Sequence, residues 1–245
     1  MRLVADALLS VLIAPVCAAC RDPLEWPTRG AVCEGCWARI VPISPPVCDR
    51  CGEPLRSWDA RRTGAPGRAS GLCRRCQDGP GAVSKSRSVG AYDGTLRAVV
   101  HALKYDGRRS LAEPLARRMR VAGADVLDGA DGVVPVPLHR ARRRSRGFNQ
   151  AEDLSAHLGL PVLGALRRRR ATRTQADLTA PERQANVRNA FALRRRVRVR
   201  GLCVVLVDDV STTGATLEAC AQALKAAGAR EVRALTAARA VSRQP

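Results

Sequence analysis

The sequence predicts an α/β fold, in which helices flank a parallel sheet, behind a small cysteine-rich N-terminal unit. Valine-rich apolar runs at residues 132–138 and 202–207 carry the sheet prediction. Runs of this kind form strands that are buried on both faces, which are typical of parallel sheets covered by helices. A third observation is that eight of the ten cysteines lie before residue 80. We therefore expect two domains, residues 1–80 and residues 81–245.

The charge of the chain is strongly positive and unevenly distributed. The formal net charge is +20, and residues 140–200 alone carry 17 basic and 4 acidic side chains. A field of this sign suits anionic partners, such as a polyphosphate substrate or nucleic acid. Because 39 of the 42 basic residues are arginine, a GC-rich coding bias that leaves a solvated surface is the alternative explanation.

The first residues are apolar but do not predict a membrane anchor. The run from Ala7 to Val16 is interrupted by Ser10 and Pro15 and is too short to span a bilayer. Apolar spacing over residues 3–12 instead predicts a short helix packed on the protein. We expect no membrane span, no secretion signal and a cytoplasmic location.

Eight cysteines form four CxxC pairs, and such pairs are typical of zinc sites. Two CxxC turns place four thiolates around one tetrahedral Zn²⁺ ion. Disulfides are typical of small secreted proteins, and a redox CxxC usually occurs once rather than four times. We therefore expect two zinc ions, and the ligands are Cys17, Cys20, Cys33, Cys36, Cys48, Cys51, Cys73 and Cys76.

The cysteine spacing favours a sequential grouping, with one ion bound by residues 17–36 and the other by residues 48–76. An interleaved grouping is the alternative. A Cys₄ site has no open position for substrate, and so small a unit needs its metal to fold, so the expected role is structural. Residues 57–71 are expected to form an exposed loop and residues 77–88 a linker.

The remaining elements of the second domain follow from apolar periodicity. Helices are expected near residues 96–103, 111–121, 151–158 and 217–227. Short strands are expected at residues 162–166 and 232–237. The arginine-dense residues 139–150 are expected to begin as a loop. Residues 167–191 are polar and include a helix that begins near Pro181, since proline fits the first turn of a helix.

The most informative stretch is residues 202–220, LCVVLVDDVSTTGATLEAC. Its apolar run ends at Asp208 and Asp209, and ligands of parallel sheets bind beyond the carboxyl ends of the strands. Gly214 permits a tight turn, and neighbouring threonine hydroxyls lie beside the N–H groups of the next helix, which favours phosphate binding. ATPases also have strands that end in Asp-Asp, but they need a GxxxxGK[ST] motif, and no lysine of this chain follows a glycine.

This stretch resembles the signature of type I phosphoribosyltransferases, in which an apolar strand runs into an acidic pair and TTGxT. The resemblance implies that Asp208 and Asp209 accept hydrogen bonds from the ribose hydroxyls of phosphoribosyl pyrophosphate (PRPP), and ionised carboxylates can only accept. It implies that the 5-phosphate lies in the loop of Ser211, Thr212, Thr213, Gly214, Ala215 and Thr216.

The same resemblance implies a pyrophosphate site that also holds Mg²⁺, near the loop after the first sheet strand. Lys104, Arg140 and Arg146 are the candidates for its positive charge. The alternatives are a lysine that complements the dipole of a helix C-terminus and a positively charged surface loop. Residues 167–191 occupy the place of the flap that closes over substrate in phosphoribosyltransferases.

Nearly the whole chain is similar to the ComF family, which joins a double zinc ribbon to a phosphoribosyltransferase domain. The segments that carry this resemblance are the four CxxC pairs, Leu103–Tyr105, Val134–Pro137, Arg146–Gln150, Thr174-Gln175, Arg183, Asn186-Val187, Ala190-Phe191 and the motif 208–216. The resemblance implies a protein that binds PRPP, transfers or senses its phosphoribosyl group, and works with competence-type DNA-processing proteins. The alternative is a catalytically silent module that binds single-stranded DNA through residues 140–200 and is regulated by PRPP.

Overall fold

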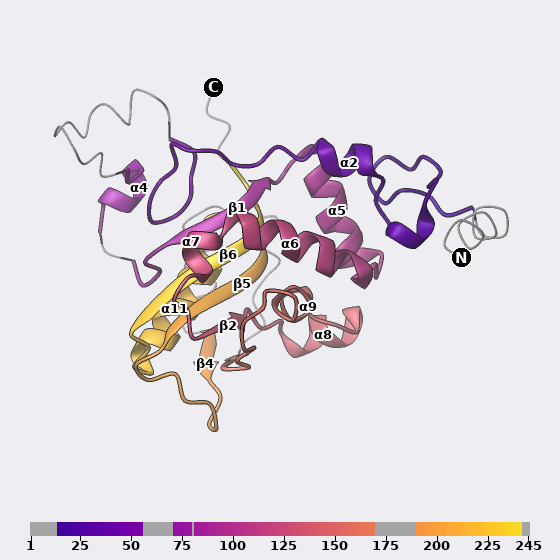
Figure 1. Ribbon diagram of the computed structural model, residues 1–245. Coiled ribbons are helices and arrows are strands. Elements are labelled where there is room, and N and C mark those ends of the chain that lie inside the picture. Colours follow the sequence, from indigo (N-terminus) through magenta and orange to yellow (C-terminus); the bar gives the residue numbers. More distant parts are fainter. Residues whose placement is uncertain (1–13, 56–70, 80, 170–189, 242–245) are drawn as a thin grey trace.

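Four parallel strands form the central sheet in the order β1-β6-β5-β2 (Figure 1). They are β1 Ser86–Ala91, β2 Gly132–Pro135, β5 Cys203–Ser211 and β6 Glu231–Arg239. The structure is a computed structural model, and it describes residues 14–55, 71–79, 81–169 and 190–241. The expected N-terminal helix, most of the expected loop 57–71, and residues 170–189 of the flap segment, with its helix near Pro181, lie outside these residues.

The sheet is buried on both faces because successive residues of its central strands point to opposite sides. In β5, Val205 and Val207 join one core cluster, whereas Val204 and Leu206 join the other. This alternation places apolar side chains on both faces, which explains why the strand has no polar positions before Asp208. The predicted fold class, a parallel sheet flanked by helices, is confirmed.

Helices cover the two faces unequally (Figure 1). One face is covered by α5 Gly94–Tyr105, α6 Ala112–Ala122, α7 Ala124–Leu127 and α9 Gln150–Ser155, and the short 3₁₀ turn η2 Arg109–Leu111 precedes α6. The other face is covered by α11 Ala215–Ala226 and by a small antiparallel pair, β3 Leu166–Arg168 and β4 Phe191–Leu193. Among the described residues, no helix is both long and apolar enough to span a bilayer.

The N-terminal unit is built as two copies of one motif. In each copy a β-bridge brackets the first CxxC pair, Val16 with Pro23 in the first and Val47 with Pro54 in the second. The second CxxC pair of each copy opens a short helix, α2 Glu34–Ala38 and α4 Arg74–Gln77; the first copy also contains the 3₁₀ turn η1 Pro27–Arg29. The same backbone hydrogen bonds recur, since Leu24 N–H donates to Pro15 and Leu55 N–H donates to Pro46, each at about 2.9 Å or less.

The two copies are attached to the sheet differently. Cys17 and Cys36 of the first copy lie in the same core cluster as Val99 of α5. The second copy is attached by Arg239 of β6, which is 2% exposed and donates from Nε to Glu53 at 2.7 Å and from Nη1 to the Cys51 carbonyl at 2.7 Å. The segment between the copies runs beside β1.

That approach to β1 requires a glycine. Pro42 forms an antiparallel bridge with Gly90, and a Cβ atom at Gly90 would lie 2.7 Å from the carbonyl oxygen of Val41. Any larger residue at this position would push the segment between the two zinc ribbons away from the sheet edge.

Two predicted elements were wrong. The segment after Leu138 is not a loop but the helix α8 Arg140–Arg146, which is capped by the His139 side chain and ends at Gly147 in the left-handed conformation. The expected linker 77–88 contains the start of β1. The strand was not predicted because its residues are small and several are polar. Ser88 is nevertheless buried, and its hydroxyl forms a 2.7 Å hydrogen bond with Thr236.

Smaller differences concern strand ends. The strand expected at residues 162–166 is only a single bridge from Val162 to Val133, and β3 begins at Leu166. β5 continues through Asp208 and Asp209 to Ser211, so both carboxylates lie within the strand rather than after it.

Candidate functional site

The acidic pair lies on β5 at the end where α9 begins and α5 ends. Asp209 is buried, and its two carboxylate oxygens have different partners. Lys104 Nζ, from the last turn of α5, lies 2.9 Å from Oδ1, and Gln150 Nε2 donates to Oδ2 at 2.6 Å. Asp208 is half-buried and accepts a 2.9 Å hydrogen bond from the Asp209 N–H. Of the two carboxylates, Asp208 is therefore the one whose side chain is less engaged by the described residues.

The start of α9 fixes Gln150 against this pair. Asn149 is buried, donates to the Val136 carbonyl at 3.1 Å and accepts from the Ala151 N–H at 3.2 Å. This side chain both caps α9 and fastens it to the end of β2. The Gln150 Oε1 atom is buried and has no hydrogen-bond partner among the described residues, so this amide has acceptor capacity left for a ligand.

The charges of the site influence one another. Burial, followed by the negative charge of Asp209, raises the pKa of Asp208 to about 7. For Lys104, burial alone would lower the pKa, but the charge and hydrogen bond of Asp209, together with the charge of Asp208, make the net direction upward. The lysine is therefore a protonated cation held beside two carboxyl groups, of which one titrates near neutral pH.

The loop after β5 leads directly into α11. Gly214 has φ 76°, a left-handed conformation that favours glycine, and occupies the N-cap position of the twelve-residue helix. The Thr213 hydroxyl accepts from the Ala215 N–H at 3.4 Å. Ser211 is buried, and its hydroxyl has no hydrogen-bond partner among the described residues. The loop thus presents hydroxyls and a helix N-terminus, a combination suited to an anion.

The carboxylates and every residue of this loop except Thr213 line one cavity of about 340 Å³. Of the predicted pyrophosphate residues, Lys104 and Arg146 line it too, and the guanidinium of Arg146 lies 5.0 Å from the centre of the Tyr105 ring. The other lining residues of this site are Tyr92, Tyr105, Val136, Pro137, Leu138, Arg142, Gln150, Arg168, Val210 and Leu217. We refer to it below as the carboxylate cavity.

Arg140 lies elsewhere. It lines a neighbouring cavity of about 740 Å³, together with six further arginines, and does not line the carboxylate cavity. Three residues that line the carboxylate cavity were not predicted from the sequence: Arg142, Gln150 and Arg168. Gln150 falls within the RGFNQ segment, and a helix reading of residues 140–146 would have put Arg142 and Arg146 one turn apart on the same face.

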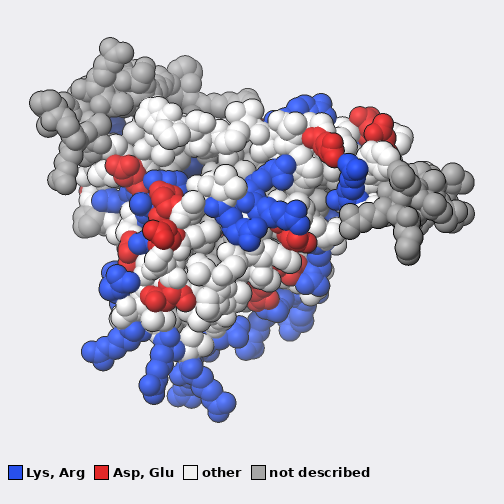
Figure 2. All heavy atoms as spheres, in the orientation of Figure 1, with Lys and Arg blue, Asp and Glu red and all other residues white. Residues whose placement is uncertain are grey.

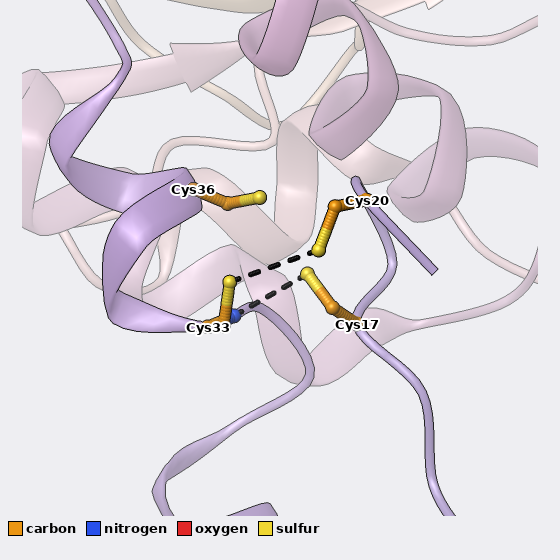
Figure 3. Close-up of side chains that lie close together, drawn as sticks. All are labelled: Cys17, Cys20, Cys33 and Cys36. Carbon is orange, nitrogen blue, oxygen red and sulfur yellow. Dashed lines mark hydrogen bonds between the residues drawn. The ribbon is translucent and has the colours of Figure 1, made fainter. Parts of the chain in front are cut away.

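The eight paired cysteines form two tetrads. The sulfur atoms of Cys17, Cys20, Cys33 and Cys36 all lie within 4.8 Å of one another, and so do those of the second tetrad, Cys48, Cys51, Cys73 and Cys76. Figure 3 shows the first four side chains converging, with Cys36 carried by α2 and Cys17 and Cys20 on the facing loop.

This geometry fits zinc. A tetrahedral ion with Zn–S bonds of about 2.3 Å has sulfurs about 3.8 Å apart. The Cys20–Cys33 and Cys51–Cys73 sulfur distances are 3.9 and 3.6 Å. The grouping is the sequential one, and each tetrad supplies four thiolates and no other ligand type, which suits a closed structural site.

Comparison with known proteins matches both halves of the chain. A double zinc ribbon family model matches residues 8–77, and a phosphoribosyl transferase domain model matches residues 144–245. A DNA utilization protein of Salmonella typhi, YhgH, is 36% identical over 89% of this chain and 93% of its own. Competence protein F of Haemophilus influenzae is 31% identical over 91% and 96%, and competence protein ComFC of Bacillus subtilis is 25% identical over 79% and 77%.

Fold, cysteine tetrads and family matches together define a double zinc ribbon protein with a phosphoribosyltransferase-type domain. Within that class, the chain belongs to the ComF family of competence and DNA utilization proteins. The predicted family is therefore confirmed, and so is the pair of zinc ribbon sites.

Proposed function

We propose that the chain binds PRPP in the carboxylate cavity and transfers or senses its phosphoribosyl group. The observation that carries this proposal is that the acidic pair, Lys104 and the 211–216 loop, apart from Thr213, line a single cavity. PRPP has three chemically distinct parts, a terminal phosphate, a diol and a pyrophosphate. The lining of the cavity offers each part a chemically complementary group.

In this proposal each part of the ligand has its own residues. The 5-phosphate lies at the 211–216 loop and the N-terminus of α11. The ribose hydroxyls donate to Asp208 in its ionised form and to Asp209, and the unsatisfied Gln150 Oε1 and Ser211 Oγ complete the polar lining. Lys104, Arg142 and Arg146 face the pyrophosphate, and the Asp209 carboxylate holds Lys104 in place beforehand.

Mg²⁺ bound with PRPP would supply further positive charge to the pyrophosphate oxygens, and the carboxyl group of Asp208 is a hard oxygen ligand of the kind that Mg²⁺ prefers. If the site is catalytic, the cations that line it stabilise the negative charge that develops on pyrophosphate as it leaves. We further propose a cytoplasmic location and a domain boundary between residues 80 and 81.

Isothermal titration calorimetry with PRPP and Mg²⁺ tests the proposal. In the double variant Asp208→Asn/Asp209→Asn we expect PRPP affinity to fall at least a hundredfold, because two charge-assisted hydrogen-bond acceptors are lost. The matched control is Asp78→Asn/Asp128→Asn, which changes two exposed aspartates outside the cavity. Equal affinity in the two double variants would show that the acidic pair does not bind the ligand.

The relatives named for competence and DNA utilization favour a second function, a link to single-stranded DNA. In this alternative the protein is a catalytically silent binding module that PRPP regulates. Arginine-rich residues 140–200 then bind the DNA backbone, and competence-type DNA-processing proteins are its partners. Backbone binding releases counterions, so we expect affinity for a single-stranded oligonucleotide to fall steeply with salt. Fluorescence anisotropy from 50 to 300 mM KCl tests this, and a flat salt dependence would reject it.

A further inference from the structure

Seven arginines converge on the larger cavity, which we call the arginine cavity. It has a volume of about 740 Å³, and its lining comes from the segment after β2, helix α8, strand β3 and the turn after β4. The lining residues are Pro137, Leu138, Arg140, Arg143, Arg167, Arg168, Arg169, Arg194 and Arg195. On the face shown in Figure 2, basic side chains project at the lower end, where β4 and the following turn lie in Figure 1.

The lining carries a large excess of positive charge. Among the described residues that line the cavity there is no carboxylate, and the ion pair of Arg143 with Glu152, at 2.6 Å, turns one guanidinium toward an acid outside the lining. Burial, and after it the neighbouring charge of Arg142, lower the pKa of Arg168. Guanidinium groups that line one cavity repel one another, and an anionic ligand would offset that repulsion.

The volume and lining of the cavity favour a compact ligand rather than a polymer. The volume of about 740 Å³ lies within the range of roughly 300 to 1,000 Å³ that is usual for small-molecule sites. Proteins that bind single-stranded nucleic acid combine a groove with aromatic stacking platforms. The described lining of this cavity contains no aromatic residue.

The arginine cavity lies directly beside the carboxylate cavity. The two share Pro137, Leu138 and Arg168, so a ligand in one lies next to a ligand in the other. Arg167 and Arg195 line only the arginine cavity, whereas Arg142 and Arg146 line only the carboxylate cavity. Each cavity therefore has cations of its own, and Arg168 belongs to both.

We propose that the arginine cavity binds a second small ligand that carries two or more linked phosphate groups, beside PRPP. Linked phosphates match clustered guanidiniums, because each guanidinium can donate two parallel hydrogen bonds to phosphate oxygens. The position of this ligand beside PRPP rests on the proposed function of the carboxylate cavity, whereas its chemical class rests on the lining of the arginine cavity alone.

Inorganic tripolyphosphate is the probe, titrated by calorimetry into the full chain at 0.15 M KCl, with and without saturating PRPP and Mg²⁺. We expect one tripolyphosphate to bind per chain when PRPP is already bound. The variant Arg167→Ser/Arg195→Ser should weaken this binding at least tenfold and leave PRPP affinity within twofold. The control Arg196→Ser/Arg198→Ser removes the same charge from exposed neighbours that do not line the cavity, and it should change tripolyphosphate affinity less than threefold.

Four outcomes would overturn the proposal. Competition between tripolyphosphate and PRPP would mean that the arginines hold the pyrophosphate end of PRPP itself. Equal losses of tripolyphosphate affinity in both double variants would mean diffuse electrostatic attraction. The absence of tripolyphosphate binding, with or without PRPP and Mg²⁺, would mean that the arginines form a solvated surface. A single-stranded 12-mer that needs Arg167 and Arg195 but is not displaced by tripolyphosphate would mean a polymer site. If PRPP fails to bind while tripolyphosphate binds as expected, the proposed function fails and this inference stands.

Discussion

Arg75 of the second zinc ribbon donates a hydrogen bond from Nη1 to the backbone carbonyl of Thr213, at 2.8 Å. The two residues are 138 positions apart, and the contact joins helix α4 to the loop that precedes α11. A second contact lies nearby, since the Glu218 carboxylate of α11 accepts from the Ala82 N–H at 2.6 Å. The zinc ribbon and the proposed 5-phosphate loop are thus mechanically linked.

Replacing Arg75 should therefore weaken PRPP binding even though this residue does not line the carboxylate cavity. A hydrogen bond of this kind contributes about 0.5–1.5 kcal/mol, so we expect Arg75→Ala to reduce affinity by roughly two- to tenfold. Arg74→Ala is the matched control, because Arg74 is an exposed arginine in the same short helix. Calorimetry measures the PRPP affinity of both variants, and identical affinities would show that the zinc ribbon does not position the loop.

The Lys104–Asp209 ion pair should matter for stability as well as for binding. Both side chains are largely buried, with 16% and 8% of their surface exposed. Breaking a buried pair from one side costs about 3–5 kcal/mol, because it leaves an uncompensated charge. We therefore expect Lys104→Met to lower the free energy of unfolding by an amount of this order in urea titrations, with Gln150 still bonded to the carboxylate.

Two further variants make this test specific. Lys104→Met/Asp209→Asn should recover most of the lost stability, since the double change leaves no buried charge. Lys85→Met breaks an exposed ion pair with Asp125, at 3.5 Å, and should cost less than about 1 kcal/mol. If Lys104→Met is no more destabilising than Lys85→Met, the pair is not a buried electrostatic contact.

The raised pKa of Asp208, about 7, predicts that PRPP affinity depends on pH. Below that pH the carboxyl is protonated and no longer acts as a purely accepting group for ribose hydroxyls. We expect affinity to rise by about tenfold from pH 6 to pH 8, because the ionised fraction rises from about one tenth to about nine tenths. Since the phosphates of PRPP also titrate, the comparison is with Asp208→Asn, in which this component should be missing.

The same raised pKa of Asp208 makes the free energy of unfolding fall as the pH rises, whereas it makes PRPP affinity rise. An unfolded aspartate has a pKa of about 3.9, so between pH 4 and pH 7 the folded chain binds a proton that the unfolded chain has lost. Stability from this group is therefore present at low pH and is lost as the pH rises toward 7. The free energy of unfolding in urea should depend differently on pH in the parent chain and in Asp208→Asn across this interval. The same pH dependence in both chains would contradict the raised pKa of Asp208.

The sequence alone predicted the elements whose signal is apolar. The strand residues Val204 to Val207 and helix α11 are recognisable in the sequence, because burial on both sheet faces gives a continuous apolar run and burial of one helix face gives apolar residues at helical spacing. β1 left no such signal, because its buried Ser88 is satisfied by Thr236, a partner 148 positions away. Helix α8 was missed for a related reason, since none of its residues is buried and it therefore shows no apolar face.

Site residues divide in the same way. Asp208 and the 211–216 loop are contiguous and could be predicted from one stretch. The partners of Asp209 come from α5 and α9, and only the packing of both helices on the same sheet face brings Lys104 and Gln150 within 3 Å of one carboxylate. The division of the arginines between two cavities also depends on the third dimension, because Arg140 and Arg146 belong to one helix but to different cavities.

The two zinc ribbons should differ in what their metal stabilises. Cys36 and Cys76 are equivalent last ligands of the two tetrads, and both are buried. Cys36 lies in the core cluster shared with Val99 of α5, whereas neither described cluster includes Cys76. Loss of the first ion should therefore disturb the α/β domain itself, and loss of the second should loosen mainly the ribbon and its Arg239–Glu53 contact.

We expect the parent chain to contain two zinc ions and Cys36→Ser and Cys76→Ser to contain one each, measured by metal release with a chromogenic chelator. The melting temperatures of the two variants are then compared by thermal unfolding, followed by far-ultraviolet circular dichroism. Cys36→Ser should lower the melting temperature of the α/β domain by more than 5 °C relative to Cys76→Ser, because about 1 kcal/mol corresponds to a few degrees in a domain of this size. Equal melting temperatures with one ion in each variant would show that the shared core does not couple the first zinc ribbon to the sheet.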